Sequence, residues 1–346
     1  MTPESWKRWA LAQLKTYFDP SELKIARALD PLDKDRNPFK SRGVELIPIP
    51  LYEGRIYNKS GAAYEMLRQD IEGGLITEGM EIFLASSGRT GDDVAEMCKR
   101  LGLPCTIIMK GDTVSPKVDL LTLKRAPISV LLTPFSTLEM AKKYAAAFHG
   151  RDICQYTHPG NAAGHCKYTA PQVFSKEHGR FDIIFVPFGT TGTGRGLLEY
   201  VKLLGLSTAI VAVVLRKGQE LPAGRTEESV IEAVGPHAFD GFSPPIKVTK
   251  YAAFVAAAAL AGRVKCENPG PTGGEATAGA FAFFDEHMDE LDRFRGIDGL
   301  VRAGIVLPDP MTSYEVVAKV VLHGEHDYGT SLITGERILE VIRSGK

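Results

Sequence analysis

Apolar runs of five to seven residues alternate along most of this chain with segments whose apolar residues recur at helical spacing. This alternation is typical of parallel sheets covered by helices on both faces, so we predict an α/β fold. Strands are predicted over residues 44–50, 81–85, 104–109, 128–132, 182–187 and 209–215, and helices over residues 62–72, 92–101, 118–124, 137–148 and 196–204, with one or two more helices within residues 1–40.

Two glycine-rich loops directly follow predicted strands, at residues 86–91 and 189–196. Ligands of open α/β sheets bind beyond the carboxyl ends of the strands. We therefore expect two lobes that face one cleft. The smaller lobe would span residues 45–180 and carry the first loop, and the larger lobe would span residues 1–44 and 181–346 and carry the second.

The second loop reads Gly-Thr-Thr-Gly-Thr-Gly-Arg-Gly and joins an apolar strand to a helix. Backbone N–H groups at a helix start, together with threonine hydroxyls, suit a phosphate. Arg195 and Gly196 stand where a nucleotide P-loop has Lys and Ser or Thr, and Leu197 replaces the third glycine of the dinucleotide fingerprint. The loop therefore favours a phosphomonoester, such as that of pyridoxal phosphate or a sugar phosphate; a plain tight turn is the alternative.

The first loop, Ser86-Ser87-Gly88-Arg89-Thr90-Gly91, opens a predicted helix. Hydroxyl groups and unpaired N–H groups at a helix start form a receptor for a carboxylate. The same residues also make a simple helix cap, and the sequence leaves both interpretations open.

Lys59 precedes the predicted helix over residues 62–72. The positive end of a helix dipole disfavours a cation and so favours the neutral amine that a nucleophilic lysine needs. A solvated surface lysine is the alternative, because the chain contains 41 Lys and Arg residues.

Composition excludes several classes of protein. The chain has 346 residues, 44% apolar and 24% charged, and a net charge of −1, which are the values of an ordinary globular protein. We therefore expect no nucleic-acid partner and no membrane partner. No apolar run is long enough to span a bilayer, and the N-terminus lacks the pattern of a signal peptide.

Five scattered cysteines, an odd number without a Cys-x-x-Cys pair, suit a reducing cytoplasm better than a disulfide framework. Cys154, His158, His165 and Cys166 lie close together in sequence, but their spacing matches no usual zinc pattern. We expect no metal site.

The order and spacing of these motifs resemble the fold-type II pyridoxal-phosphate enzymes, most of all the cysteine synthase branch and the related tryptophan synthase β chain. The resemblance implies a two-lobed α/β fold, pyridoxal 5'-phosphate attached to Lys59, and a homodimer. It also assigns the two loops. The cofactor phosphate would bind Gly189, Thr190, Thr191, Gly192 and Thr193, and the substrate carboxylate would bind Ser86, Ser87, Gly88, Thr90 and Gln155.

Three further segments carry the resemblance. Residues 155–161 resemble the family's Gln-Phe-x-Asn-Pro-x-Asn segment, which gives Gln155 its implied role. Residues 270–274 resemble the segment whose hydroxyl bonds the pyridine nitrogen, which would make Thr272 that residue. Residues 234–238 and the Gly324-Glu325 pair with Tyr328 resemble two other family loops.

Two departures bear on the reaction. Arg89 replaces the family's Asn beside the cofactor's phenolic oxygen. Three roles stay open: Arg89 binds that oxygen of the cofactor, binds a second acidic group of the substrate, or points out of the site. Asn58 and Ser60 flank Lys59 as Asn and Thr do in the D-cysteine desulfhydrase and aminocyclopropane-carboxylate deaminase branch.

The resemblance implies a lyase or transferase of amino-acid metabolism. It would replace the β-substituent of an activated serine or cysteine-type amino acid through an aminoacrylate. A β-elimination lyase or deaminase is the first alternative, and a catalytically silent binding partner is the second. The neutral hydroxyl of Thr272 favours loss of a β-substituent over transamination.

Overall fold

The computed structural model describes residues 1–23, 28–53, 56–86, 88–111, 113, 118, 127–175, 179–215, 245–260, 271–307 and 334–345. The chain divides into two compact units, each with its own sheet. Unit 1 comprises Met1–Lys24 and Ile56–Thr169, and unit 2 comprises Ile25–Arg55 and Ala170–Lys346.

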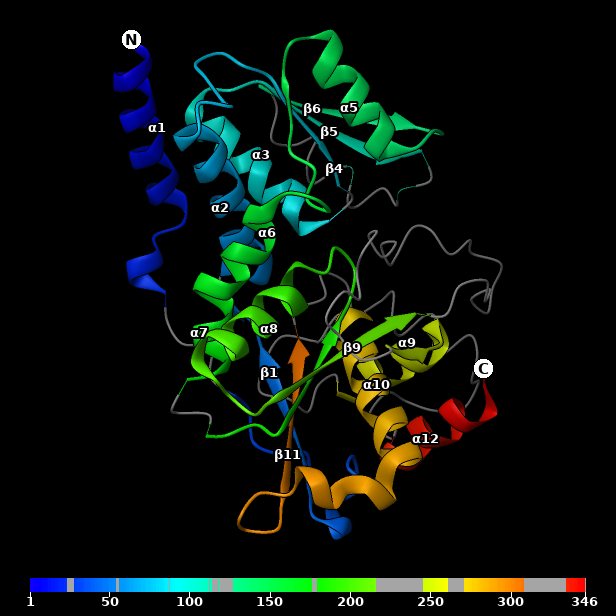
Figure 1. The fold of residues 1–346 in the computed structure, drawn as a ribbon. Coiled ribbons are helices and arrows are strands. Elements are labelled where there is room, and N and C mark those ends of the chain that lie inside the picture. The colour runs from blue at the N-terminus through cyan, green and yellow to red at the C-terminus, as the bar shows by residue number, and fades with distance from the viewer. Residues whose placement is uncertain are drawn as a thin grey trace. The chain divides into compact units, whose positions relative to one another are not determined.

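Unit 1 contains a parallel sheet in the order β6-β5-β4-β7 (Figure 1). Its strands are β4 (Ile82–Ala85), β5 (Cys105–Lys110), β6 (Ile128–Thr133) and β7 (Arg151–Asp152). Its helices are α1 (Pro3–Tyr17), α2 (Asn58–Glu72), α3 (Arg89–Leu101), α5 (Thr137–Ala147), α6 (Pro159–Gly164) and a π-helical turn at His165–Thr169; η1 (Pro20–Glu22) and β3 (Ile56–Tyr57) are short.

Alternation along the strands sends apolar side chains to both faces of this sheet. Ile82 and Leu84 of β4 lie in one core cluster with residues of α1, α2 and α3. Phe83 and Ala85 lie in a separate cluster with residues of α5. The sheet is therefore covered by helices on both faces, as the apolar runs predict.

Unit 2 contains a parallel sheet in the order β1-β11-β8-β9-β10. Its strands are β1 (Val44–Pro50), β8 (Ile183–Pro187), β9 (Ala209–Leu215), β10 (Ile246–Val248) and β11 (Val301–Leu307). Its helices are α7 (Ala170–Val173), α8 (Gly192–Leu204), α9 (Lys250–Leu260), α10 (Pro271–His287) and α12 (Gly335–Ser344); η2 (Lys40–Arg42), η6 (Met288–Phe294) and β2 (Tyr52–Glu53) are short.

The second sheet is also covered on both faces. Ile183 and Phe185 of β8 pack with residues of α9, α10 and α12. Ile184 and Val186 pack with residues of α7 and α8. Helix α8 and the pair α9 and α10 accordingly lie on opposite faces of β8 and β9.

The predicted strands agree with the structure closely, and those over residues 44–50 and 209–215 are matched to the residue. Helix starts are predicted less well. Helix α2 begins at Asn58 and α8 at Gly192, four residues before the predicted starts, because their first turns consist of small and polar residues that resemble a loop. The predicted helix over residues 118–124 lies outside the described residues except for residue 118.

The two units differ from the expected lobes over residues 1–24, 45–55 and 170–180. Strand β1 belongs to unit 2 because it pairs along its whole length with β11. Helix α1 belongs to unit 1 because Trp6, Ala10 and Leu14 lie in the core that it shares with α2 and α3.

Helix α2 contacts α6 and the π-helical turn through glycines. A Cβ atom at Gly164 would lie 2.7 Å from the Ala62 Cα, and one at Gly160 would lie 2.8 Å from the Met66 Cα. Such separations are below those of real Cβ contacts, so the close approach of these backbones requires glycine at both positions.

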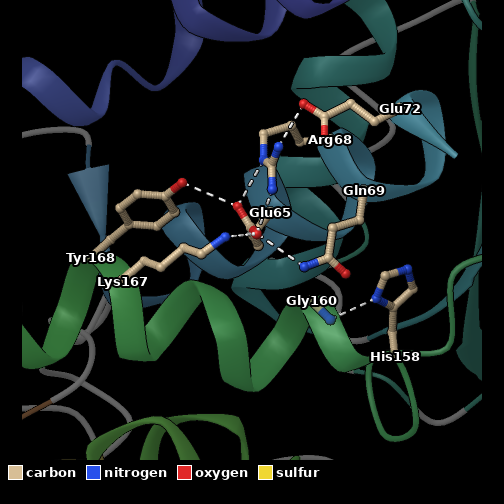
Figure 2. Close-up of polar contacts among 8 residues, drawn as sticks. All are labelled: Glu65, Arg68, Gln69, Glu72, His158, Gly160, Lys167 and Tyr168. Carbon is tan, nitrogen blue, oxygen red and sulfur yellow. Dashed lines mark hydrogen bonds and ion pairs between the residues drawn. The ribbon is translucent and has the colours of Figure 1, made fainter. Parts of the chain in front are cut away.

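The buried Glu65 carboxylate of α2 also joins this helix to the π-helical turn (Figure 2). Its side chain is fully buried and accepts hydrogen bonds from four side chains. The donors are Arg68 (2.9 and 2.8 Å) and Gln69 (2.9 Å) on α2, and Lys167 (2.5 Å) and Tyr168 (3.1 Å) on the π-helical turn. Burial acts to raise the pKa of Glu65, but bonds from Arg68, Lys167 and Gln69 outweigh it and hold the pKa at about 2, below the ordinary 4.5.

Within the described residues, no helix is long and apolar enough to cross a membrane.

We predict that Glu65→Gln lowers the free energy of unfolding at pH 7 by about 2–3 kcal/mol, because Arg68 and Lys167 would lose their buried anionic acceptor. Since the folded-state pKa of Glu65 is depressed, its contribution is present above the unfolded pKa and is lost as the pH falls toward 2. Urea unfolding should therefore show nearly the same difference between the two proteins at pH 7 and 5, and a smaller difference at pH 3.5.

The matched control is Glu72→Gln. Glu72 pairs with the same arginine, but its side chain is 45% exposed, so we expect a loss below about 0.5 kcal/mol. Equal losses in the two variants, or a difference that does not shrink with acid, would contradict the assignment.

Candidate functional site

Lys59 is the second residue of α2 and is half-buried between the buried Asn58 and Ser60. The structure thus places the predicted lysine in the positive first turn of a helix. His165 of the π-helical turn is fully buried, and its Nδ1 lies 2.9 Å from the Thr169 Oγ1. Burial, and secondly the charge of Lys59, lower the pKa of His165 well below its ordinary value, so a neutral imidazole lies within electrostatic reach of Lys59.

The loop after β4 is a helix cap in this structure. The Ser86 hydroxyl oxygen accepts hydrogen bonds from the N–H groups of Gly91 (3.1 Å) and Gly88 (3.4 Å) at the start of α3. Its O–H can still be donated to a ligand, so capping and carboxylate binding are compatible. Arg89 and Thr90 open α3, with Thr90 buried, and Ser87 lies outside the described residues.

Gln155 lies at this same loop. Its buried side chain donates from Nε2 to the Ala85 carbonyl at the end of β4, 3.0 Å away. The Asn161 side chain in turn donates to the Gln155 carbonyl at 2.7 Å. The structure therefore brings together, within unit 1, the two elements that the resemblance assigns to the substrate carboxylate.

His158 and Asp70 fix the start of α6 in that segment. The His158 Nδ1 accepts the Gly160 N–H at 2.9 Å, so the ring proton must lie on Nε2, which faces the Asp70 carboxylate at 3.1 Å. Burial acts to raise the pKa of Asp70, but bonds from His158 and Arg151 outweigh it and lower the pKa. His158 and His165 therefore have structural partners, and no cluster of three potential metal ligands occurs among the described residues.

The second loop, in unit 2, has the geometry of an anion site. Thr191 adopts a left-handed backbone (φ 69°) directly before the first residue of α8. The side chains of Thr190, Thr191 and Thr193 are buried against this turn rather than extended into solvent. A Cβ atom at Gly194 would lie 2.1 Å from the Phe188 ring, so the first turn of α8 requires glycine there. Helix N–H groups, hydroxyls and a backbone without side chains at Gly192 and Gly194 fit a phosphomonoester.

Glu275 on α10 is 2% exposed and is not among the residues predicted from the sequence. Burial raises its pKa well above the ordinary value and favours the neutral acid, although the backbone N–H of Phe188, the residue that precedes the phosphate loop, acts in the opposite direction. Its Oε1 has no hydrogen-bond partner among the described residues. A single acid within a run of Gly and Ala residues is the sequence signal that could have found it.

Other predicted site residues are described in part or not at all. Thr272 lies in the first turn of α10, where its backbone is described but its side chain is not. The segment over residues 234–238 and the residues Gly324, Glu325 and Tyr328 lie outside the described residues.

Comparisons with known proteins agree with the motifs. The sequence model of the family described as "Pyridoxal-phosphate dependent enzyme" matches residues 58–280. The chain is 29% identical over 164 residues to a cystathionine beta-synthase of Apis mellifera, covering 45% of this chain and 32% of that protein. It is 26% identical over 150 residues to cysteine synthase 1 of Emericella nidulans, covering 42% and 40%. The matched segment thus spans less than half the length of either curated relative.

Solved structures of low identity share the fold. A cysteine synthase from Entamoeba histolytica superposes with a TM-score of 0.71 at 18% identity, over 93% of this chain and 94% of that one. An O-ureido-L-serine synthase superposes with a TM-score of 0.69 at 18% identity, over 90% and 96%. The predicted α/β fold of the fold-type II class is thereby confirmed.

The family match covers more than half of the chain and includes Lys59, both glycine-rich loops and Thr272. The predicted resemblance to pyridoxal-phosphate enzymes is confirmed, and with it the cofactor, pyridoxal 5'-phosphate. This chain belongs to the pyridoxal-phosphate dependent enzyme family.

Proposed function

We propose that this chain replaces the β-substituent of an activated serine or cysteine-type amino acid, with pyridoxal phosphate attached to Lys59. The observation that carries the proposal is the half-buried Lys59 in the first turn of α2, within reach of a neutral imidazole and inside the family-matched segment. Cysteine synthases and an O-ureido-L-serine synthase among the similar proteins support this type of reaction.

Each part of the cofactor has proposed partners. The phosphate would bind the N–H groups at the start of α8 and the loop residues Gly189, Thr190, Thr191, Gly192 and Thr193. The hydroxyl of Thr272 would meet the pyridine nitrogen, and Arg89 the phenolic oxygen. When bound, pyridoxal phosphate withdraws electrons from the α-carbon of an amino acid.

The protein's own groups would orient the substrate and move its proton. Ser86, Ser87, Gly88, Thr90 and Gln155 would hold the carboxylate, with the donors supplied by the start of α3 and by the Gln155 amide. The Lys59 amine, once displaced by the substrate, would accept the α-proton as a general base. Because the pKa of His165 is lowered, its imidazole is neutral and adds no second positive charge near the Lys59 amine, which suits a general base.

A second candidate is β-elimination, as in a lyase or deaminase. The feature that favours it is the pair Asn58 and Ser60 on either side of Lys59, where this chain resembles the desulfhydrase branch, and both residues are buried at the lysine turn. Pyruvate release from D-cysteine in the absence of an added nucleophile would identify this activity, and a requirement for the nucleophile would identify replacement.

We further propose a cytoplasmic homodimer. The five cysteines, an odd number without a Cys-x-x-Cys pair, support a reducing compartment. The dimer is implied by the resemblance, and sedimentation of the purified chain tests it.

We predict that pyridoxal phosphate added to the purified chain produces the visible absorbance band of the lysine-bound cofactor, and that Lys59→Arg abolishes it, because guanidinium keeps the charge but is not a nucleophile. Borohydride reduction and peptide mass spectrometry should find the cofactor on Lys59. Lys99→Arg, at an exposed lysine of α3, is the control and should keep the band. A normal band in Lys59→Arg would refute the proposal.

We predict that Gln155→Ala weakens the binding of the amino-acid substrate about tenfold, the effect of about one hydrogen bond to a charged group, with an unchanged cofactor band. Spectral titration with O-acetylserine measures the dissociation constant. Gln13→Ala on α1 is the control with the same change of side chain. A weakened cofactor band with unchanged substrate affinity would show that Gln155 serves the cofactor instead.

A further inference from the structure

One buried carboxylate oxygen joins three helices at the lysine turn. The Tyr17 hydroxyl at the end of α1 donates to the Asp93 Oδ1 at 2.6 Å, and the Ser60 hydroxyl of α2 donates to the same oxygen at 2.9 Å. Asp93 lies on α3 and is 1% exposed. The residue next to Lys59 is therefore bonded, through Asp93, to the N-terminal helix.

Tyr17 keeps the proton that it donates to Asp93. Burial, and secondly the charge of Asp93, keep the pKa of its phenol well above the ordinary 10, so the hydroxyl retains its proton and donates at all physiological pH values. The Arg100 guanidinium lies 5.3 Å from the centre of the Tyr17 ring, which fixes the ring from the α3 side.

Gly61, which follows Ser60 in the first turn of α2, is packed against two aromatic rings. A Cβ atom at Gly61 would lie 3.1 Å from the Phe18 Cζ and 3.1 Å from the Tyr168 Cδ2. The rings of Phe18 and Tyr168 are themselves 5.3 Å apart. Ser60 is thus held by a hydrogen bond, and Gly61 is closely packed.

We propose that Tyr17, Asp93 and Ser60 are positioning residues for Lys59, so that helix α1, which precedes the family-matched segment, is an integral part of the lysine site. The inference rests on the proposed role of Lys59. A fixed first turn limits the directions in which the Lys59 side chain leaves the helix, and small misplacements of a reacting group are costly. Asp93 also follows the Ser86–Gly91 loop on α3, so the same oxygen sets the lysine turn relative to that loop.

The first test uses the protein without cofactor, with His165 as the reporter. The charge of Lys59 contributes to the lowered pKa of His165, second to burial. Histidine NMR should show the protonation midpoint of His165 moving to higher pH in Tyr17→Phe and in Ser60→Ala, because a loosened turn lets the Lys59 charge move away. A loss of overall stability does not by itself produce this shift.

The matched control is Lys7→Met. Lys7 donates to the Glu72 carbonyl at the far end of α2, so this variant weakens the docking of α1 without touching Asp93. We expect its thermal unfolding midpoint to fall as in Tyr17→Phe, with the His165 midpoint unchanged.

The second test adds pyridoxal phosphate and measures the absorbance of the lysine-bound form. Tyr17→Phe and Ser60→Ala should each raise the apparent dissociation constant about threefold to tenfold, the effect of one hydrogen bond. In the double variant the apparent dissociation constant should rise by less than the product of the two single increases, since both hydrogen bonds act through one oxygen. Ser60→Thr keeps the hydroxyl and should restore affinity, and Lys7→Met should change it less than twofold.

Two results would overturn the inference: an unchanged His165 midpoint in both Tyr17→Phe and Ser60→Ala, or an equal shift in Lys7→Met. If the wild-type chain forms no lysine-bound cofactor, the proposed function fails, while the His165 titration still decides whether α1 positions Lys59. If Ser60→Ala fails to fold, Tyr17→Phe, which removes a single oxygen, carries the test alone.

Discussion

Four side chains converge on the Glu65 carboxylate, and the position of the lysine turn depends on that convergence. Glu65 lies less than two helical turns after Lys59, and two of its donors come from the π-helical turn that also carries His165. A fully buried carboxylate would be costly without such donors. The network therefore holds α2 against the π-helical turn. The glycines of α6 allow the backbones of α6 and α2 to lie close together.

The buried titratable groups fall into two kinds, and their environments explain the difference. Glu65 and Asp70 have cationic and amide or imidazole donors, so their carboxylates stay charged and hold helices together. His165 and Glu275 are buried without a compensating charge, so burial lowers the pKa of His165 and raises that of Glu275, and both shifts favour the neutral form. The charged pairs of unit 1 are structural, whereas the neutral groups lie beside the lysine in unit 1 and beside the phosphate loop in unit 2.

Much of the fold and part of the site could be predicted from local sequence. Buried parallel strands are near-continuous apolar runs, so β1 and β9 were found to the residue. The Gly/Thr loop can be recognised from sequence because only glycine allows a contact as close as that of Gly194 with Phe188. The left-handed backbone at Thr191 could not be expected, because β-branched residues rarely adopt it. Helix starts were misplaced because the first turns of α2 and α8 are composed of the residues that also make loops.

The alternating α/β plan, the candidate lysine and the failure of both nucleotide patterns can be read from the chain, since each depends on residues close together in it. The surroundings of the lysine depend instead on how distant segments pack. Tyr17 and Asp93 are 76 positions apart, and Ser60 and Asp93 are 33 apart. No periodicity or motif encodes such pairs, because they form only when separate helices pack around one buried oxygen. The same packing made Ser86 a helix cap and assigned the two histidines of the apparent metal cluster to structural partners.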